Sequence, residues 1–469
     1  MMIFIANYFN LVLIIYTIWL SAITETDESY IKTELLNGKK YSDNIGWSIP
    51  EQIPIEIGER APHGADIAIG NKGLYMTFQV YAPGVYQPHD VWLITFKDGT
   101  WQAPILIRET SFTADGSKVA VSDRSQDDII HLVWWDKRSD QPYSSENLFS
   151  EDTISEIWYT YKNNGEWSEP LKLFEGNHFN PKLTKPVFGE NSDSLYFTYY
   201  AGEEIENDGI PSLFLASGKG EVWQTTGPIV KGGGAEGSLI QLNADSIIVA
   251  FRAPGFDWIK NNYDSDWRGI SLKISKDHGN SWADPFLIYR NEWEQSVTAN
   301  PRIITDQSGL FHLFWRQDTT GDNQPDRVVH TRSKDGLNWS EIELLEIHPT
   351  PNSSVLKYDI AVSSEGNIHI VSETWTEEDR VALMHSIWNG MHWSTNEVLF
   401  DGNRMRNPII EYDKAENQLH LVFQAQDPTD QDQNGLKEWM DFETIHSERD
   451  RFGYDRLSGW SWYHAVFVE

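Results

Sequence analysis

The sequence contains no cysteine among its 469 residues, and its basic residues are few. Without cysteine, disulfide bonds and thiolate metal sites are excluded, so stability has to come from a large core or from bound ions. The 37 Lys and Arg stand against 70 Asp and Glu, which gives a formal net charge of −33. Such a surface repels the phosphate backbone of nucleic acids, and nucleic acid is therefore excluded as a partner.

Long apolar runs are absent after the N-terminal segment, so we expect no stable insertion into a membrane. Residues 1–24 carry no charge, and the apolar run Leu11–Leu20 precedes the small residues Ser21 and Ala22. This pattern predicts a signal peptide at 1–24 and a linker at 25–44, with a retained anchor as the alternative. We therefore expect a secreted protein, in the periplasm or outside the cell.

Aromatic residues are plentiful at 13%, and many tryptophans close a recurring turn. The fullest copy is Ser275–Trp282, in which Asp277 and Gly279 precede Trp282. Shorter copies end at Trp101, Trp167, Trp223, Trp339 and Trp393, with Gly46-Trp47 and Gly459-Trp460 as echoes at the two ends. Asp accepts backbone N–H bonds in such a turn, Gly permits a positive φ, and Trp can pack between repeats.

A β-rich apolar segment lies midway through each repeat unit. These segments are Leu74–Val80, Ile130–Trp135, Leu195–Tyr200, Ile247–Phe251, Phe311–Trp315, Ile368–Val371 and Leu419–Phe423. Each is flanked by two further strand-like segments and the tryptophan turn, without a convincing amphipathic helix. The pattern predicts an all-β propeller of six to seven four-stranded blades over residues 45–469, with seven favoured.

The phase of the repeat predicts which face carries the chemistry. If the tryptophan turn joins the third and fourth strands, the starts of the first strands and the connections between second and third strands converge on the opposite face. The polar residues at these places are Arg60, His63, His178, Glu236, Tyr358, Arg404, Arg406, Asp136, Arg138, Tyr200, Arg252, Arg316, Glu373, Trp375, Asp90, Arg268, Arg327 and Arg380. Because an arginine fork binds carboxylates bidentately, so basic a set in an acidic chain favours an anionic ligand such as a sugar carboxylate. The alternative is that arginines at equivalent repeat positions pair with acidic loops.

Several of these residues resemble the sialidase (neuraminidase) superfamily, whose recurring mark is the Asp box. Arg60-Ala61-Pro62 before the strand Leu74–Phe78 is similar to that family's first-blade arginine. The segment from Glu236 to Arg252, Arg327 before an Asp box, and Tyr358 followed by Glu373 are similar to its later motifs.

The resemblance implies a retaining exo-α-sialidase-like hydrolase with a tyrosine nucleophile. Arg60, Arg252 and Arg327 would bind the sugar carboxylate, and Glu373 would hold Arg60. Tyr358 would attack the anomeric carbon after Glu236 takes its proton, and Asp90 is the candidate acid/base. A neutral nucleophile suits this carbon, because the carbon already bears a carboxylate.

Two other functions remain open for the same predicted fold. A polysaccharide lyase or another glycosidase acting on uronate-containing glycans would use His63, His178 or Tyr200 as base or acid. A non-catalytic glycan-binding propeller would keep the arginines without needing the pair of Tyr358 and Glu236. The histidines inside strands, His131, His312, His369 and His420, recur in the repeat itself and are interpreted as structural.

Two acidic loops are candidate calcium sites, although the implied reaction needs no cofactor. Asp430, Asp432, Asn434 and Asp441 surround a Gly turn with hard oxygen ligands, and Asp318, Asp322 and Asp326 form a poorer copy. In both cases the alternative is a solvated acidic loop. The predicted partner is a glycan with a carboxylate sugar, and the protein is expected to be a monomer.

Overall fold

The structure is a computed structural model. It describes residues 46–55, 57, 62–81, 88–110, 113–122, 127–138, 154–176, 182–189, 194–201, 212–230, 235–241, 245–257, 262–291, 298–320, 325–345, 354–375, 381–394, 397–400, 405–426 and 460–468. These residues form seven antiparallel sheets, here called blades 1 to 7 in chain order. Within them, no helix is long and apolar enough to span a membrane.

The first three blades contain five strands each. Blade 1 contains β3 (His63–Gly70), β4 (Gly73–Tyr81), β5 (Pro88–Lys97), β6 (Thr100–Trp101) and β7 (Ile105–Arg108). Blade 2 contains β8 (Thr113–Ser122), β9 (Ile129–Arg138), β10 (Ile154–Asn163), β11 (Glu166–Trp167) and β12 (Leu171–Gly176). Blade 3 contains β13 (Lys182–Leu183), β14 (Val187–Phe188), β15 (Leu195–Ala201), β16 (Ser212–Lys219) and β17 (Val222–Val230).

The next three blades have four strands each. Blade 4 contains β18 (Ala235–Gln241), β19 (Ile247–Asp257), β20 (Asn262–Ser275) and β21 (Phe286–Arg290). Blade 5 contains β22 (Thr298–Thr305), β23 (Phe311–Gln317), β24 (Arg327–Ser333) and β25 (Glu343–Leu345). Blade 6 contains β26 (Ser354–Val362), β27 (Ile368–Trp375), β28 (Val381–Trp388) and β29 (Glu397–Phe400).

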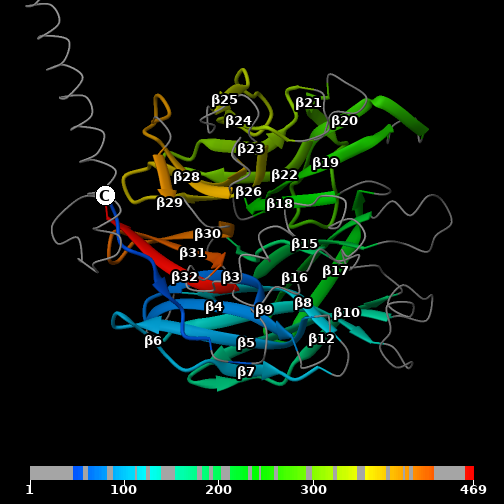
Figure 1. Ribbon diagram of the computed structural model, residues 1–469. Coiled ribbons are helices and arrows are strands. Elements are labelled where there is room, and N and C mark those ends of the chain that lie inside the picture. The colour runs from blue at the N-terminus through cyan, green and yellow to red at the C-terminus, as the bar shows by residue number, and fades with distance from the viewer. Residues whose placement is uncertain are drawn as a thin grey trace, which may run out of the picture.

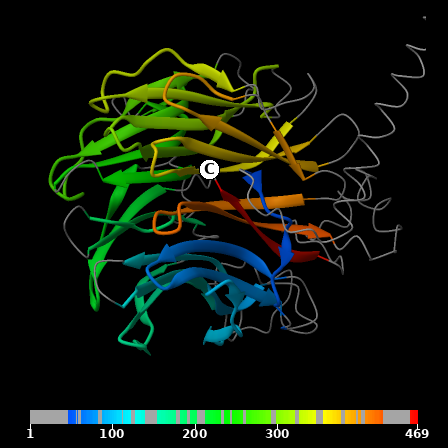
Figure 2. The ribbon, with the colours of Figure 1, turned by 90° about the vertical axis from the view of Figure 1, so that its left-hand side faces the viewer.

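Blade 7 joins the two ends of the described chain. It contains β30 (Met405–Asp413), β31 (Gln418–Gln426) and β32 (Trp460–Val468), and its outer strands are β1 (Gly46–Trp47) and β2 (Glu51–Gln52). Figures 1 and 2 show the blades following one another around the molecule, so that blue blade 1 lies beside orange and red blade 7. The predicted propeller is confirmed, and the favoured number of seven blades is correct.

The structure corrects the assignment of Trp460. This residue begins β32, the third strand of blade 7, instead of closing a turn. The seventh turn tryptophan is Trp47, which pairs with Phe467 across β1 and β32. The count of seven holds because the N-terminal strand completes the last blade.

The core lies between blades. The described residues form seven clusters of buried apolar side chains, and each cluster spans one junction; for example, Val133 and Ile157 of blade 2 pack with Leu195 and Phe197 of blade 3. The turn tryptophans contribute to these junctions as predicted. The Trp223 ring centroid lies 4.6 Å from that of Tyr159 in the preceding blade.

Candidate functional site

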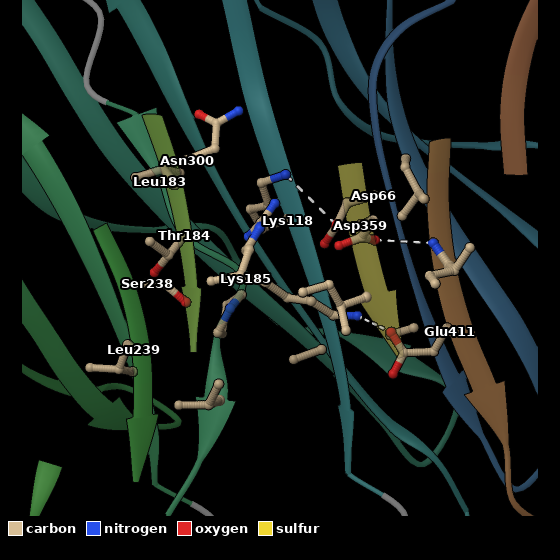
Figure 3. Close-up of a pocket in the computed structure, with 18 of the residues that line it drawn as sticks. Asp66, Lys118, Leu183, Thr184, Lys185, Ser238, Leu239, Asn300, Asp359 and Glu411 are labelled. Atoms are coloured by element: carbon tan, nitrogen blue, oxygen red, sulfur yellow. Dashed lines mark hydrogen bonds and ion pairs between the residues drawn. The ribbon is translucent and has the colours of Figure 1, made fainter. Parts of the chain in front are cut away.

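The first strands surround a cavity of about 780 Å³ on the propeller axis, called here the axial cavity. Its wall takes residues from every blade: 64–66, 68–69, 116, 118, 120–121, 183–188, 237–239, 300–304, 357–360 and 407–411. Figure 3 shows part of this wall. The volume lies within the range of about 300–1,000 Å³ that is usual for small-molecule sites.

A bulge in the first strand turns side chains toward the axis. The pairing register shifts in β3, β8, β18, β22, β26 and β30, as expected for one extra residue. Four bulges contain a left-handed residue, which is Gly64, Gly116, Asn300 or Asn407, with φ of 62°, 61°, 50° and 55°. Gly and Asn are the residues that adopt this conformation most readily.

The side chains that follow the bulges link neighbouring blades. Asp66 Oδ2 accepts the Val119 N–H at 3.0 Å, and Asp359 Oδ2 accepts the Ile410 N–H at 3.0 Å. Ser238 Oγ accepts the Ile303 N–H at 3.1 Å in the same way. These residues therefore have a structural role as well as a place on the cavity wall.

Charged side chains of both signs meet in the axial cavity. Lys185 reaches from blade 3 to pair with Glu411 of blade 7, and its Nζ also donates to the Ile67 carbonyl at 2.7 Å. Lys118 Nζ lies 3.7 Å from Asp66 Oδ1. Figure 3 shows the Asp66, Asp359 and Glu411 side chains on one side of the pocket, with Lys118 and Ser238 facing them.

The fields of these groups shift their pKa values. Burial raises the pKa of Asp359, against the opposing fields of Arg302 and Lys185. Burial also raises the pKa of Glu411, and Lys185 opposes that shift. Burial alone would lower the pKa of Lys185, but Glu411 and Asp66 raise it above its usual value. The charges on the wall therefore stabilise one another across blades.

Tyr358 is the only residue of the predicted catalytic set whose described side chain lines the axial cavity. It lies in β26 and is 4% exposed, and its hydroxyl donates to the Asn300 carbonyl of blade 5 at 2.6 Å. The phenol therefore joins two blades at the cavity wall.

Glu373 lies on β27, next to the strand that carries Tyr358. Its Oε2 accepts the Asn407 N–H at 2.8 Å. Burial raises its pKa, while Lys357, Arg406 and Arg316 pull that pKa down. Glu373 thus lies within the field of three cations, while its predicted partner Arg60 lies outside the described residues.

Arg252, Arg327 and Asp90 of the predicted site are described but do not line the axial cavity. Arg252 on β19 pairs in register with Ala235, the neighbour of Glu236 on β18. Arg327 begins β24, and its Nη1 donates to the Asp326 carbonyl at 2.8 Å. Asp90 on β5 accepts the Thr110 N–H at 2.9 Å. Their predicted roles in substrate binding and acid/base chemistry remain predictions.

Part of the predicted site lies outside the described residues. This holds for Arg60, His178, Asp322 and the calcium candidates Asp430, Asp432, Asn434 and Asp441, while for His63 and Glu236 the backbone alone is described. In the poorer calcium loop, Asp326 accepts the Thr319 N–H at 2.7 Å and its hydroxyl at 2.6 Å. Where the structure describes the chain, it places no group of three His, Cys, Asp or Glu around a metal position.

Seven charged residues on the cavity wall were missed in the sequence: Asp66, Lys118, Lys185, Arg302, Lys357, Asp359 and Glu411. The sequence does mark these positions in four blades. Gly64, Gly116, Asn300-Pro301 and Asn407-Pro408 stand just before the equivalent inward position of the first strand. The bulge conceals that signal, since the extra residue breaks the alternation by which inward positions are read.

The chain is similar to several solved structures. A protein of unknown function from Dyadobacter fermentans has a TM-score of 0.47 at 12% identity, over 92% of this chain and 99% of that one. A Trypanosoma rangeli sialidase in complex with the inhibitor DANA has a TM-score of 0.46 at 10% identity, over 87% and 55%. A PL25 ulvan lyase has a TM-score of 0.47 at 12% identity, over 82% and 92%. No curated protein matches the chain.

A family model settles the relationship. The model of the BNR repeat-like domain matches residues 150–403, more than half of the chain. This region covers the Asp-box turns at Asp277 and Asp335, where the carboxylates accept backbone N–H bonds of Ser281 and Asn338. The predicted resemblance to Asp-box propellers is confirmed, and the chain belongs to the BNR repeat-like domain family.

Proposed function

We propose that this protein is a carbohydrate-active enzyme that hydrolyses glycosides of an acidic sugar at the axial cavity. The observation that carries the proposal is the lining of this cavity. Its wall combines Tyr358 with four cations and three carboxylates, in a chain whose net charge is −33. The cations are Lys118, Lys185, Arg302 and Lys357. A carboxylate sugar is the carbohydrate class that such a wall favours.

In the proposed reaction, Tyr358 is the nucleophile. Its hydroxyl donates to the Asn300 carbonyl, so attack requires the phenol to exchange this acceptor for a base. Glu236 precedes Gly237, which lines the same cavity, and it is the proposed base. The Tyr358 oxygen bonds to the anomeric carbon as the glycosidic bond breaks, and the proposed acid, Asp90, protonates the departing oxygen. Water, deprotonated by the same carboxylate, then releases the sugar from Tyr358.

The test is Tyr358→Phe, which removes the nucleophilic oxygen and keeps the ring. Because Tyr412 also has a hydrogen-bonded hydroxyl but does not line the cavity, Tyr412→Phe is the matched control. We expect kcat on sialosides to fall more than about a hundredfold in Tyr358→Phe, with substrate binding retained. The control should keep its activity.

Three outcomes would contradict the proposal. Unchanged turnover in Tyr358→Phe would make this tyrosine a link between blades only. Unsaturated, ultraviolet-absorbing products from uronate polysaccharides would identify a lyase. Binding without turnover across both glycan classes would identify a non-catalytic propeller.

A further inference from the structure

With the exception of Lys357, the charged residues around the axial cavity are grouped by blade. Asp359, Glu411 and Asp66 come from blades 6, 7 and 1, which are consecutive around the closed ring and are called here the acidic arc. Lys118, Lys185, Ser238 and Arg302 come from blades 2 to 5 and are called the basic arc. Lys357 of blade 6 also lines the cavity, but its Nζ donates to Asn407 Oδ1. Apart from Lys357, the charged residues of the wall divide into one acidic and one basic side.

Lys185 is the member of the basic arc that is fully engaged. It crosses the cavity to Glu411 and to the Ile67 carbonyl, and Figure 3 shows this side chain reaching toward Glu411. Its positive charge is therefore neutralised by the acidic arc. Lys185 thus links blade 3 to blades 1 and 7. Lys118 and Arg302 are the basic residues of the basic arc that remain to bind a ligand.

Lys118 and Arg302 keep donors that the described residues do not satisfy. Lys118 has one loose ion pair of 3.7 Å with Asp66. Arg302 is half-buried on the wall and acts on Asp359 through its field, and no hydrogen bond or ion pair joins it to another described residue. Ser238 Oγ already accepts the Ile303 N–H, so its own proton is available to donate.

We propose that the axial cavity is a polarised subsite for one sugar acid, which gives the proposed function its substrate orientation. The sugar carboxylate lies on the basic arc against Arg302, Lys118 and the Ser238 hydroxyl. The sugar hydroxyls donate to the acidic arc at Asp66 and Asp359, whose remaining lone pairs face the cavity. This inference rests on the proposed carbohydrate function, but it concerns binding and needs no turnover.

The complementarity predicts a ranking of ligands. A sugar acid matches both arcs, whereas a neutral sugar matches only the acidic arc and inorganic sulfate matches only the basic arc. Glucuronate and N-acetylneuraminate should therefore bind at least about tenfold more tightly than glucose or sulfate, since a charge-assisted hydrogen bond is worth about that factor.

The test is calorimetric titration of the full chain with these four probes. Arg302→Gln and Lys118→Met should each raise the Kd for the sugar acids about tenfold and leave the Kd for glucose unchanged. Arg302→Lys should recover part of the loss, because it keeps the charge without the fork. Lys276→Met is the control, since Lys276 is exposed on an Asp-box turn and does not line the cavity.

The results separate the subsite from the reaction. Equal affinity for glucose and glucuronate, no binding of either sugar acid, or unchanged Kd values in both variants would overturn the polarised subsite. Thermal melting of each variant identifies one that fails to fold, and the other variant then decides. Loss of sugar-acid affinity in Arg302→Gln, with full turnover in Tyr358→Phe, would keep the subsite and reject the proposed nucleophile.

Discussion

Histidine occupies equivalent buried positions in four blades. The second-strand residues His131, His312, His369 and His420 are at most 5% exposed, and each is hydrogen-bonded to a tyrosine or histidine side chain on the third strand. In blades 5 to 7 that partner is a second histidine, as in the pair His420–His464 with a 2.9 Å Nδ1–Nε2 distance. The interpretation of these histidines as structural is confirmed.

These pairs predict loss of stability in acid. Burial lowers the pKa of His420 to about 4, and burial with the field of His420 lowers that of His464 to about 3. Burial and the field of His312 lower the pKa of His330 to about 2. Protonation therefore favours the unfolded chain, whose histidines have a pKa of about 6.5. Stability is complete above that pH and falls by about 1.4 kcal/mol per pH unit for each such histidine below it.

Urea unfolding at pH 7, 6 and 5 checks this expectation. The double variant His420→Tyr with His464→Leu copies Tyr196 and Leu215, which occupy the same two positions in blade 3. In this variant the free energy of unfolding should depend less steeply on pH, because the contributions of His420 and His464 are removed. A slope identical to that of the wild type would contradict the account.

Strand bulges decide what the first strands present to the axis. The apolar segments of the sequence located the second strand of every blade, because these strands are continuous and buried. The recurring tryptophans located the turns. Neither pattern located Arg302 or Asp359, since the bulge shifts the inward positions by one residue. Of the predicted catalytic residues, Tyr358 does line the cavity in the structure, because it directly follows such a bulge.

The bulge conformation predicts an asymmetric response to substitution. Asn300 has a φ of 50°, and glycine occupies the same place in blades 1 and 2. Asn300→Gly should change the free energy of unfolding by less than about 1 kcal/mol, whereas Asn300→Val should cost about 1–3 kcal/mol. Denaturant unfolding of the two variants measures the difference. Equal stability would show that the bulge does not require the left-handed conformation.

Closure of the ring depends on the N-terminal strands. Ser48 N donates to the Val466 carbonyl at 2.7 Å, and the Trp47 indole N–H donates to His385 Nδ1 at 3.2 Å. These contacts connect blade 7 to blade 6 and supply the outer strands of blade 7. The seven-bladed ring is therefore completed by residues more than 400 positions apart in the chain.

Truncation tests the role of closure. A chain that begins at residue 46 keeps β1 and β2, whereas one that begins at residue 56 exposes the edge of β32. The shorter chain should melt at a lower temperature and aggregate more readily, because an unpaired strand edge recruits other strands. Identical melting curves for the two chains would contradict this role of the N-terminal strands.

The central claim, hydrolysis of an acidic glycoside by a tyrosine nucleophile, is tested most directly by the stereochemistry of the product. Proton nuclear magnetic resonance during turnover of an α-sialoside distinguishes the anomer that is released first. A covalent intermediate on Tyr358 predicts that the α-anomer appears first and then converts to the β-anomer in solution. Initial release of the β-anomer, or of an unsaturated sugar, would contradict the claim.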